Sequence, residues 1–483
     1  QFRFTQALDV EVLERSIQRI INRHEVLRTV YKEQEDQVYQ LIQATNNWSL
    51  KVVSSKAINK EALIEQTINA PFDLSADHMI RGVLFAEEYG SYLLVLVLHH
   101  IATDGWSQNQ LIRELVELYD AQINNREANL PELAIQYSDY AIWQRSHLSG
   151  DHLSEKLGYW KEKLAGVESL NLPLDYTRPA IQSHRGDGLG FHLSKELTGA
   201  LRELCQQEEV TLFMLLLSGF KVLLYKYSGQ TDICVGSPMA NRREGELKNL
   251  IGFFVNSIAL RSDLSDNPRF LDLLQSLKST TLSAYQHQDA PFEKVVEEVV
   301  DSRELSSSPI FQVMFTLQNV LEEIKQGASE QEGLLNLQTN NSSGGKRLYK
   351  ISKYDLTVGI QEHGEELIVD IEYCIDLFKE ETIRYMGQHY LAILESIVKA
   401  PAERIDDITL LNKTEREQLL VGFNDTKFSY PNDESIGAQF KKQVAKRANA
   451  TALIFEGKTM TYQALEEQSN QLAWHLIHIG VQP

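Results

Sequence analysis

The chain has 483 residues, of which 43% are hydrophobic and 24% are charged, and this composition is typical of a globular protein with two or three domains. Its formal net charge of −20 argues against nonspecific nucleic-acid binding, which requires a basic surface. No apolar run is long enough to span a bilayer, so we expect no membrane partner. The three cysteines are far apart and form no CxxC pair, which favours a reducing, cytoplasmic compartment.

The first 29 residues predict a strand and then a helix with a charged end. Residues 1–4 have the character of a strand interior. Asp9 is a candidate N-cap, and an apolar stripe of helical period runs from Val10 to Ile21. The charged segment Arg23–Thr29 then ends the helix.

A short apolar run, residues 91–98, leads directly to two histidines. It is too short for a membrane span and predicts a buried strand. Downstream, residues 108–124 carry an apolar stripe that predicts a helix. Ser107 and Gln110 have the spacing of a capping box, so we expect this helix to begin at Ser107. The order is therefore strand, two histidines, Asp-Gly turn and helix.

The two histidines, His99 and His100, are adjacent in the sequence. If the strand continued through them, their side chains would point to opposite faces, so one would be packed and the other presented to a cavity. A chelating pair would prefer the spacing i,i+2 on a strand or i,i+4 on a helix, and no other His/Cys cluster has ligand spacing. We therefore expect no metal site.

A connector divides the remaining chain. Residues 170–179 contain two prolines and no helical period, which predicts an irregular link between two lobes. Further on, the apolar patterns predict both strands and helices. We expect strands at 188–193 and 232–236, and helices at 194–207, 211–227 and 379–399.

Residues 99–105 fit the pattern HHxxxDG, and the chain resembles the condensation domains of nonribosomal peptide synthetases. The identification depends on further motifs that follow in the family's order. These are RHEVLRT at 23–29, APFDL at 70–74, YSDYAIWQR at 137–145, IGFFVNSIALR at 251–261, HQDAPFE at 287–293 and DSRELSSSPIFQVMF at 301–315, the last of which departs from the family's pattern at its start. Each motif alone fits a core strand, a helix or a loop, but chance does not readily produce the ordered set. In YSDYAIWQR, we expect Tyr140 and Trp143 to be core residues.

The resemblance implies an α/β fold with two chloramphenicol acetyltransferase-like lobes in a V-shaped pseudo-dimer, and an active site between the lobes. The tail stretches 423–431, 452–457 and 460–465 resemble the start of an adenylation domain. The expected organisation is an N-terminal lobe at 1–170 whose first segment is missing, an interlobe connector at 171–180, a C-terminal lobe at 181–412, a linker at 413–430 and a truncated adenylation domain at 431–483.

The reaction that the resemblance implies is peptide-bond formation, in which the amine of an acceptor aminoacyl thioester attacks a donor aminoacyl or peptidyl thioester. Donor and acceptor peptidyl carrier proteins would supply both substrates on phosphopantetheine arms. The chain contains no attachment serine in a GG(H/D)S context, so no covalently bound cofactor is expected. The HQDAPFE and FQVMF stretches favour an L-configured donor.

Site residues are also carried over from the resemblance. His100 would be the catalytic base or a group that positions the amine, since histidine has an unperturbed pKa near ~6.5. His99 would be structural, and Asp104 would be a buried carboxylate paired with an arginine, for which Arg28 is the candidate. Gly105 would let substrate pass close to the backbone. The candidates for lining the substrate channel or supporting the site are Trp106, Ser107 and Asn256, and for Trp106 core packing is the alternative.

Several other functions remain as alternatives. Epimerization domains keep HHxxxDG, but usually no adenylation start follows them. A noncatalytic module that only docks carrier proteins is also possible, although the intact His100, Asp104 and Gly105 argue against it. Heterocyclization domains replace the histidine motif with aspartates, and a serine hydrolase would need a GxSxG motif that this chain lacks.

Overall fold

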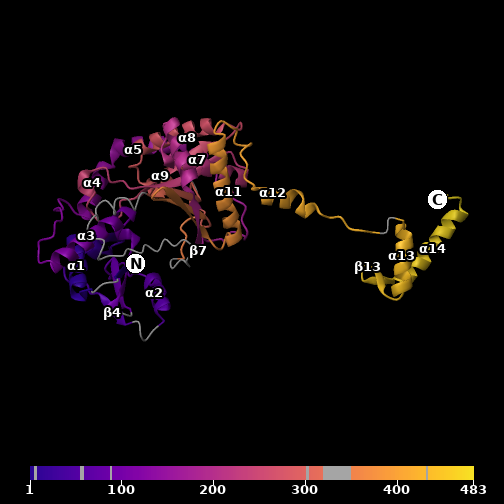
Figure 1. Ribbon diagram of the computed structural model, residues 1–483, viewed down its shortest axis with the longest axis horizontal. Helices are drawn as coiled ribbons and strands as arrows, with labels where there is room; N and C mark the ends of the chain where they lie inside the picture. Colours follow the sequence, from indigo (N-terminus) through magenta and orange to yellow (C-terminus); the bar gives the residue numbers. More distant parts are fainter. Residues whose placement is uncertain are drawn as a thin grey trace. The chain divides into compact units, whose positions relative to one another are not determined.

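The computed structural model describes residues 1–4, 8–54, 59–87, 90–300, 304–318, 350–430 and 433–482 (Figure 1). The chain divides into two compact units, Gln1–Asn412 and Lys413–Pro483. The first unit contains two lobes, each built on its own β-sheet and with its own hydrophobic core. The predicted α/β class is therefore confirmed.

The N-terminal lobe is built on a four-stranded sheet in the order β1-β6-β5-β4. Its strands are β1 (Phe2–Phe4), β4 (Lys51–Ser54), β5 (Ile80–Ala86) and β6 (Tyr92–Leu98). Strand β6 is the predicted apolar run. Leu94 lies in one apolar cluster and its neighbours Leu93 and Val95 lie in another, on the opposite face of the sheet. Because both faces are covered, the strand is apolar throughout.

Helices cover both faces of this sheet. Helices α1 and α3 pack together over the face that contains Leu94, whereas α2 covers the other face. Asp9 caps α1 as predicted, since its side chain accepts a hydrogen bond from the Val12 N–H at 3.0 Å. The remaining elements up to the second lobe are α1 (Val10–Arg23), η1 (Glu25–Arg28), β2 (Thr29–Gln34), β3 (Gln37–Ile42), α2 (Lys60–Asn69), η4 (His100–Ala102), α3 (Gly105–Ile123), α4 (Tyr137–His147) and α5 (Gly150–Lys163).

The C-terminal lobe is built on a six-stranded sheet in the order β7-β12-β11-β10-β8-β9. Its strands are β7 (Gly186–Leu193), β8 (Asp232–Met239), β9 (Asn256–Asp263), β10 (Val313–Gln318), β11 (Leu356–His363) and β12 (Glu366–Cys374). Strand β10 pairs in parallel with β8 and β11, and the other pairs are antiparallel. The predicted strand at 232–236 thus continues to Met239.

A layer of helices covers one face of this sheet (Figure 1). The helices of this lobe are α6 (Lys195–Gln207), α7 (Leu212–Ser228), α8 (Phe270–Gln286), α9 (Phe292–Val299) and α11 (Glu380–Lys399), and a short 3₁₀ turn, η5, spans Gly245–Leu247. Along β12, Leu367, Val369 and Ile371 are buried, whereas Asp370 and Glu372 are half-buried on the opposite face. This alternation shows that only one face of the sheet is fully covered.

The border between the lobes differs from the expected one at residue 170. Trp160 and Leu164, on and just after α5, belong to the C-terminal core, and α5 packs against α9. Helix α4 lies at the contact between the lobes, where Tyr140 packs against Leu250 and neighbouring apolar residues. Tyr140 is therefore a core residue as predicted. The same prediction was wrong for Trp143, which is 46% exposed.

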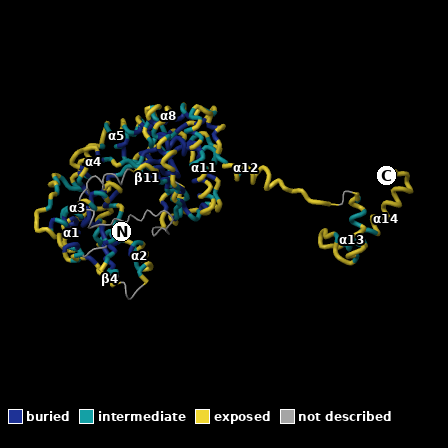
Figure 2. Tube along the Cα trace, viewed as in Figure 1, coloured by how far each residue is buried: buried dark blue, intermediate teal, exposed yellow. Residues whose placement is uncertain are grey.

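The second unit contains α12 (Lys413–Leu420), η6 (Gly422–Asn424), α13 (Ile436–Arg447), β13 (Thr451–Phe455), β14 (Lys458–Thr461) and α14 (Tyr462–His478). None of its α-helices contains a buried residue, whereas buried residues are abundant in the first unit (Figure 2). Among the residues that the structure describes, no single helix has the length and apolarity to cross a membrane; only α6 and α7 together, bent by 107°, reach those criteria.

A fully buried lysine, Lys221, lies on α7. Its ammonium donates hydrogen bonds to the Leu260 carbonyl at 2.6 Å, the Ser262 hydroxyl at 2.8 Å and the Ile233 carbonyl at 3.3 Å. These contacts tie α7 to β8 and β9. None of these acceptors is a carboxylate, and burial lowers the pKa of Lys221 to about 7.

This pKa predicts a pH dependence of stability. In the unfolded chain a lysine titrates near ~10.4, so between pH 7 and pH 10 the folded protein binds fewer protons than the unfolded chain. Raising the pH through this window therefore increases the free energy of unfolding, by up to about 1.4 kcal/mol per pH unit from this group. Urea unfolding at pH 7 and pH 9 should show a higher free energy of unfolding at pH 9 for the parent protein. In Lys221→Met this increase should be absent. A surface control, Lys399→Met, should keep the gain. Equal pH dependence in the parent and Lys221→Met would contradict the assignment.

Candidate active site

The two histidines lie just beyond β6, which ends at Leu98, so the strand does not continue through them. His99 is the N-cap of η4 and His100 is the first residue of that 3₁₀ turn. Their rings nevertheless diverge. The His99 ring contacts the Phe72 ring edge-on at a centroid distance of 5.6 Å, within the N-terminal lobe. The His100 ring contacts the Phe253 ring of the C-terminal lobe at 5.1 Å and 88°.

Hydrogen bonds assign opposite tautomers to the two rings. His100 Nδ1 lies 2.6 Å from the carbonyl oxygen of Thr103, and because a carbonyl can only accept, Nδ1 carries the proton. In the neutral ring, the His100 Nε2 lone pair is then available to accept a proton. His99 Nδ1 instead accepts the N–H of Ile101 at 3.1 Å. Burial, with smaller contributions from the positive charges of His100 and Lys353, lowers the pKa of His99.

Asp104 is buried at the start of α3. Its Oδ1 accepts the Ser107 N–H at 2.8 Å, so Asp104 is the N-cap and the helix begins at Gly105. The prediction that the helix begins at Ser107 was therefore wrong. The Ser107 hydroxyl also contacts Asp104 Oδ1, at 2.7 Å.

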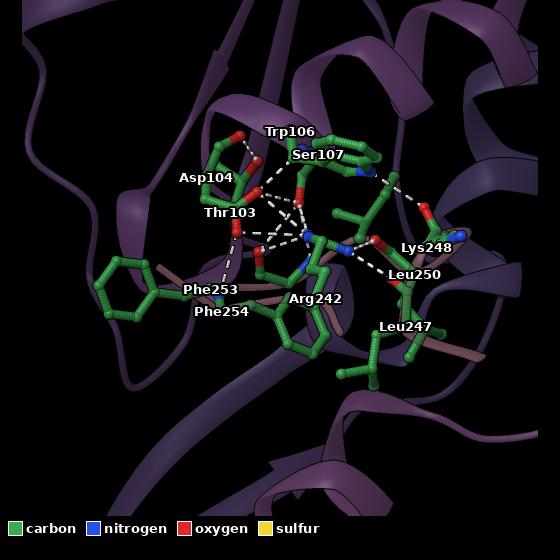
Figure 3. Close-up of polar contacts among 12 residues, drawn as sticks. Thr103, Asp104, Trp106, Ser107, Arg242, Leu247, Lys248, Leu250, Phe253 and Phe254 are labelled. Carbon is green, nitrogen blue, oxygen red and sulfur yellow. Dashed lines mark hydrogen bonds and ion pairs between the residues drawn. The ribbon is translucent and has the colours of Figure 1, made fainter. Parts of the chain in front are cut away.

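The arginine that pairs with Asp104 is Arg242, which follows β8 in the C-terminal lobe (Figure 3). Arg242 Nη2 lies 3.1 Å from Oδ1 and 3.3 Å from Oδ2, and the two side chains are 2% and 0% exposed. Its other nitrogen, Nη1, donates to the carbonyls of Leu247 and Leu250 at 2.6 and 2.7 Å. The guanidinium carbon lies 4.1 Å from the centre of the Phe254 ring. A buried ion pair therefore joins the two lobes.

The prediction that Arg28 pairs with Asp104 was wrong. Its Nη1 donates to the Gln43 carbonyl at 2.6 Å, and its Nη2 lies 3.3 Å from Glu25. Arg28 thus stabilises the turn of its own motif. No local pattern in the sequence connects Arg242 with Asp104, because the two residues lie 138 positions apart.

Four consecutive residues of the C-terminal lobe, Ile251–Phe254, form a segment that we call the strap. Side chains of the N-terminal lobe bind its backbone at every residue. The contacts are Ile251 N–H to His24 Nδ1 at 3.3 Å, Gly252 N–H to Ser107 Oγ at 3.1 Å, Tyr137 O–H to the Phe253 carbonyl at 2.7 Å and Phe254 N–H to Asp104 Oδ2 at 3.1 Å. The strap therefore has a fixed position relative to the histidine motif.

His24 accepts the Ile251 N–H because its other ring nitrogen is occupied. Nε2 lies 3.0 Å from both carboxylate oxygens of Glu114, so it carries the proton and leaves Nδ1 as an acceptor. Burial alone would raise the pKa of Glu114, but hydrogen bonds from His24 and Gln110 and the charge of Arg23 lower it overall. His24 belongs to the RHEVLRT motif, from which only Arg28 had been assigned a role.

The remaining predicted residues have different surroundings. Ser107 is fully buried in the Asp104–Arg242 cluster, so its expected place in a substrate channel was wrong. Trp106 is 38% exposed, which argues against core packing, and its Nε1–H donates to the Lys248 carbonyl across the lobes at 3.1 Å (Figure 3). Gly105 is exposed, and a Cβ placed there would meet no atom within 4 Å.

Asn256 lies at the start of β9 and shapes the HQDAPFE loop. Its Nδ2 donates to the carbonyls of Gln288 and Ala290 at 2.7 and 2.6 Å, and its Oδ1 accepts the Phe292 N–H at 3.0 Å. These three contacts are all made within the C-terminal lobe. Within the described ranges, no three His, Cys, Asp or Glu side chains converge in a way that could hold a metal ion.

Comparisons with known proteins identify relatives over the whole chain. A family described as "Condensation domain" matches residues 1–420, and one described as "AMP-binding enzyme" matches residues 440–483. A linear gramicidin synthase from Brevibacillus parabrevis is 40% identical over 99% of this chain. That alignment covers 9% of the gramicidin synthase chain, so the present chain spans less than a tenth of this curated relative.

Solved structures share the two-lobed fold. A four-domain nonribosomal peptide synthetase bound to AMP and glycine is 25% identical, with a TM-score of 0.81, and the match covers 100% of this chain and 37% of that one. The X-domain in its complex with OxyB from teicoplanin biosynthesis is 26% identical, with a TM-score of 0.75. That match covers 85% of this chain and 90% of the other.

The cross-lobe ion pair predicts unequal costs for two arginine substitutions. Arg242→Ala leaves the buried Asp104 carboxylate without its cationic partner, so it should lower the free energy of unfolding by about 3–5 kcal/mol. Arg28→Ala removes mainly one hydrogen bond to a carbonyl and should cost about 1 kcal/mol. Urea unfolding of both variants measures the difference. Equal costs would show that the Asp104–Arg242 pair does not contribute as described.

Proposed function

The chain belongs to the condensation-domain family, and we propose that it forms a peptide bond in nonribosomal peptide synthesis. The amine nitrogen of the acceptor attacks the carbonyl carbon of the donor thioester. The C–N bond forms, the C–S bond breaks, and the proton lost from the amine balances the thiol that leaves. Donor and acceptor peptidyl carrier proteins present the two substrates on phosphopantetheine arms, and the adjoining adenylation domain is the neighbour in the chain.

The observation that carries this proposal is the orientation of His100. Thr103 holds the proton on Nδ1, which leaves the Nε2 lone pair on an exposed ring at the contact between the lobes. An amine brought to Nε2 can donate a hydrogen bond to it, or a proton during the attack. A positioned base typically raises the rate ~10²–10⁴-fold, which corresponds to about 3–5 kcal/mol of activation free energy. Alignment of two tethered reactants lowers the activation free energy by on the order of 7–11 kcal/mol. Alignment is therefore the larger effect.

The buried residues serve this alignment indirectly. Asp104 and Arg242 are hidden from substrate, and their contacts fix the loop that presents His100 and the strap that faces it. Loss of activity after a change at Asp104 would therefore report lost structure.

The HQDAPFE and FQVMF stretches support an L-configured donor, and the three free, buried cysteines support a cytoplasmic location.

A noncatalytic docking module is the second candidate, because the X-domain relative was solved as a complex with OxyB. The exposed His100 with its defined tautomer favours catalysis over docking alone. An epimerization domain is less favoured, because the match to an AMP-binding enzyme directly follows the condensation match.

The proposal predicts that His100→Ala lowers the rate of dipeptide formation by ~10²–10⁴-fold while the protein remains folded. Donor and acceptor carrier proteins would be loaded with aminoacyl-phosphopantetheine, and intact mass spectrometry of the acceptor carrier would detect the product. His192→Ala, at an exposed histidine of β7, is the matched control and should retain activity. No product from the parent with several substrate pairs would favour the docking module. Equal rates for parent and His100→Ala would leave alignment as the source of catalysis.

A second prediction concerns Gly105, where substrate is proposed to approach the backbone. Because a Cβ at this position meets no protein atom, Gly105→Ala should change the free energy of unfolding by less than about 1 kcal/mol. Its methyl group would instead obstruct the substrate, so turnover should fall and KM should rise. Gly158→Ala on α5 introduces a methyl group into equally open space and should leave both unchanged. Unaltered kinetics in Gly105→Ala would place the substrate path elsewhere.

A further inference from the structure

The strap presents one exposed side chain, that of Phe253. Its neighbours Ile251 and Phe254 are 1% and 2% exposed, whereas Phe253 is 38% exposed. A large apolar ring left in water forgoes the favourable burial that its neighbours have. The exposed Phe253 ring lies beside the proposed catalytic histidine, His100. This position indicates that a bound ligand covers the ring.

The backbone of Phe253 has little freedom to move. Tyr137 donates to its carbonyl at 2.7 Å, and the flanking Gly252 and Phe254 N–H groups are bound by side chains of the other lobe. Packing is also tight, because a Cβ on Gly252 would lie 2.4 Å from the Tyr137 ring. The backbone that carries the Phe253 side chain is thus held in place before any substrate arrives.

The ring of Phe253 stands edge-on to the His100 imidazole, at a centroid distance of 5.1 Å. In the proposed reaction, the acceptor amine is held at His100 Nε2. The carbon atom that bears this amine also bears the acceptor's side chain, so this side chain must lie within a few ångströms of the same place. Phe253 is therefore within reach of the acceptor's side chain.

We propose that Phe253 is a specificity-determining residue whose exposed ring is covered by the acceptor's side chain, so that the site favours acceptors with apolar side chains. This inference rests on the proposed function. The contact selects between acceptors because an apolar side chain removes water from the ring, whereas a polar side chain of similar size must give up its own hydrogen bonds to do so.

The test compares leucine and asparagine as acceptors, since their side chains have similar size and opposite polarity. Both would be loaded on the acceptor carrier with one fixed donor, and the ratio of initial rates would be measured. The parent should prefer leucine, and Phe253→Ala should reduce this ratio about tenfold or more. Phe253→Leu keeps an apolar surface and should retain most of the ratio. Phe428→Ala, at a phenylalanine that is 82% exposed in the second unit, is the matched control.

Four results would overturn the inference. One is a parent enzyme with no preference for leucine, and another is a ratio unchanged in Phe253→Ala. The third is an equal loss of rate with both acceptors, complete loss included. The fourth is a leucine-to-asparagine rate ratio that Phe253→Ala changes when the two amino acids are loaded as donors but not when they are loaded as acceptors. If the parent forms no product with any pair, the proposed function itself fails, and this outcome is distinct from the others.

Discussion

The buried carboxylate of Asp104 is the constraint on which the site depends. A carboxylate without partners in such a place would be strongly unfavourable, so its charge must be met by donors. Ser107 supplies them from the first turn of α3, while Arg242 and the Phe254 N–H supply them from the other lobe. The same group therefore starts a helix, neutralises a buried guanidinium and fixes the contact between the lobes.

The consequence is a division of roles within a short stretch of sequence. Asp104 and Ser107 face inward and hold the strap, whereas His100 and Gly105 face outward. The strap is organised in the same way. Its backbone is bound by the N-terminal lobe, and within it only Phe253 presents its side chain outward. Both sides of the proposed reaction site are thus held by buried polar contacts between the lobes.

Sequence patterns predicted local features such as strands and helix caps, and they did not predict contacts between residues far apart in the chain. The apolar run before the histidines became a strand covered on both faces, and the Asp9 cap follows from its spacing to the α1 stripe. The partner of Asp104 could not be found this way, because Arg242 lies 138 residues away and has no periodic pattern around it. Arg28 was chosen for its place in a motif, and motif membership says nothing about which charge a side chain meets.

Other errors have the same origin. Asp104 and Ser107 both have side chains that can cap a helix N-terminus. In the structure Asp104 is the cap, while the Ser107 hydroxyl binds the strap of the other lobe. The lobe border was placed at a proline-rich connector, yet Trp160 already packs in the C-terminal core. The exposure of Trp143 was missed because a helical aromatic stripe does not show which face the neighbouring lobe covers.

The central claim is that contacts between the lobes hold the strap rigidly opposite the histidine motif. Hydrogen-exchange mass spectrometry on a peptide that covers residues 251–254 tests this most directly, because exchange reports how often a backbone hydrogen bond opens. The account predicts that the Ile251, Gly252 and Phe254 amides exchange as slowly as the core strands, and that Ser107→Ala speeds exchange of this peptide. Exchange as fast as that of an exposed loop in the parent protein would contradict the claim.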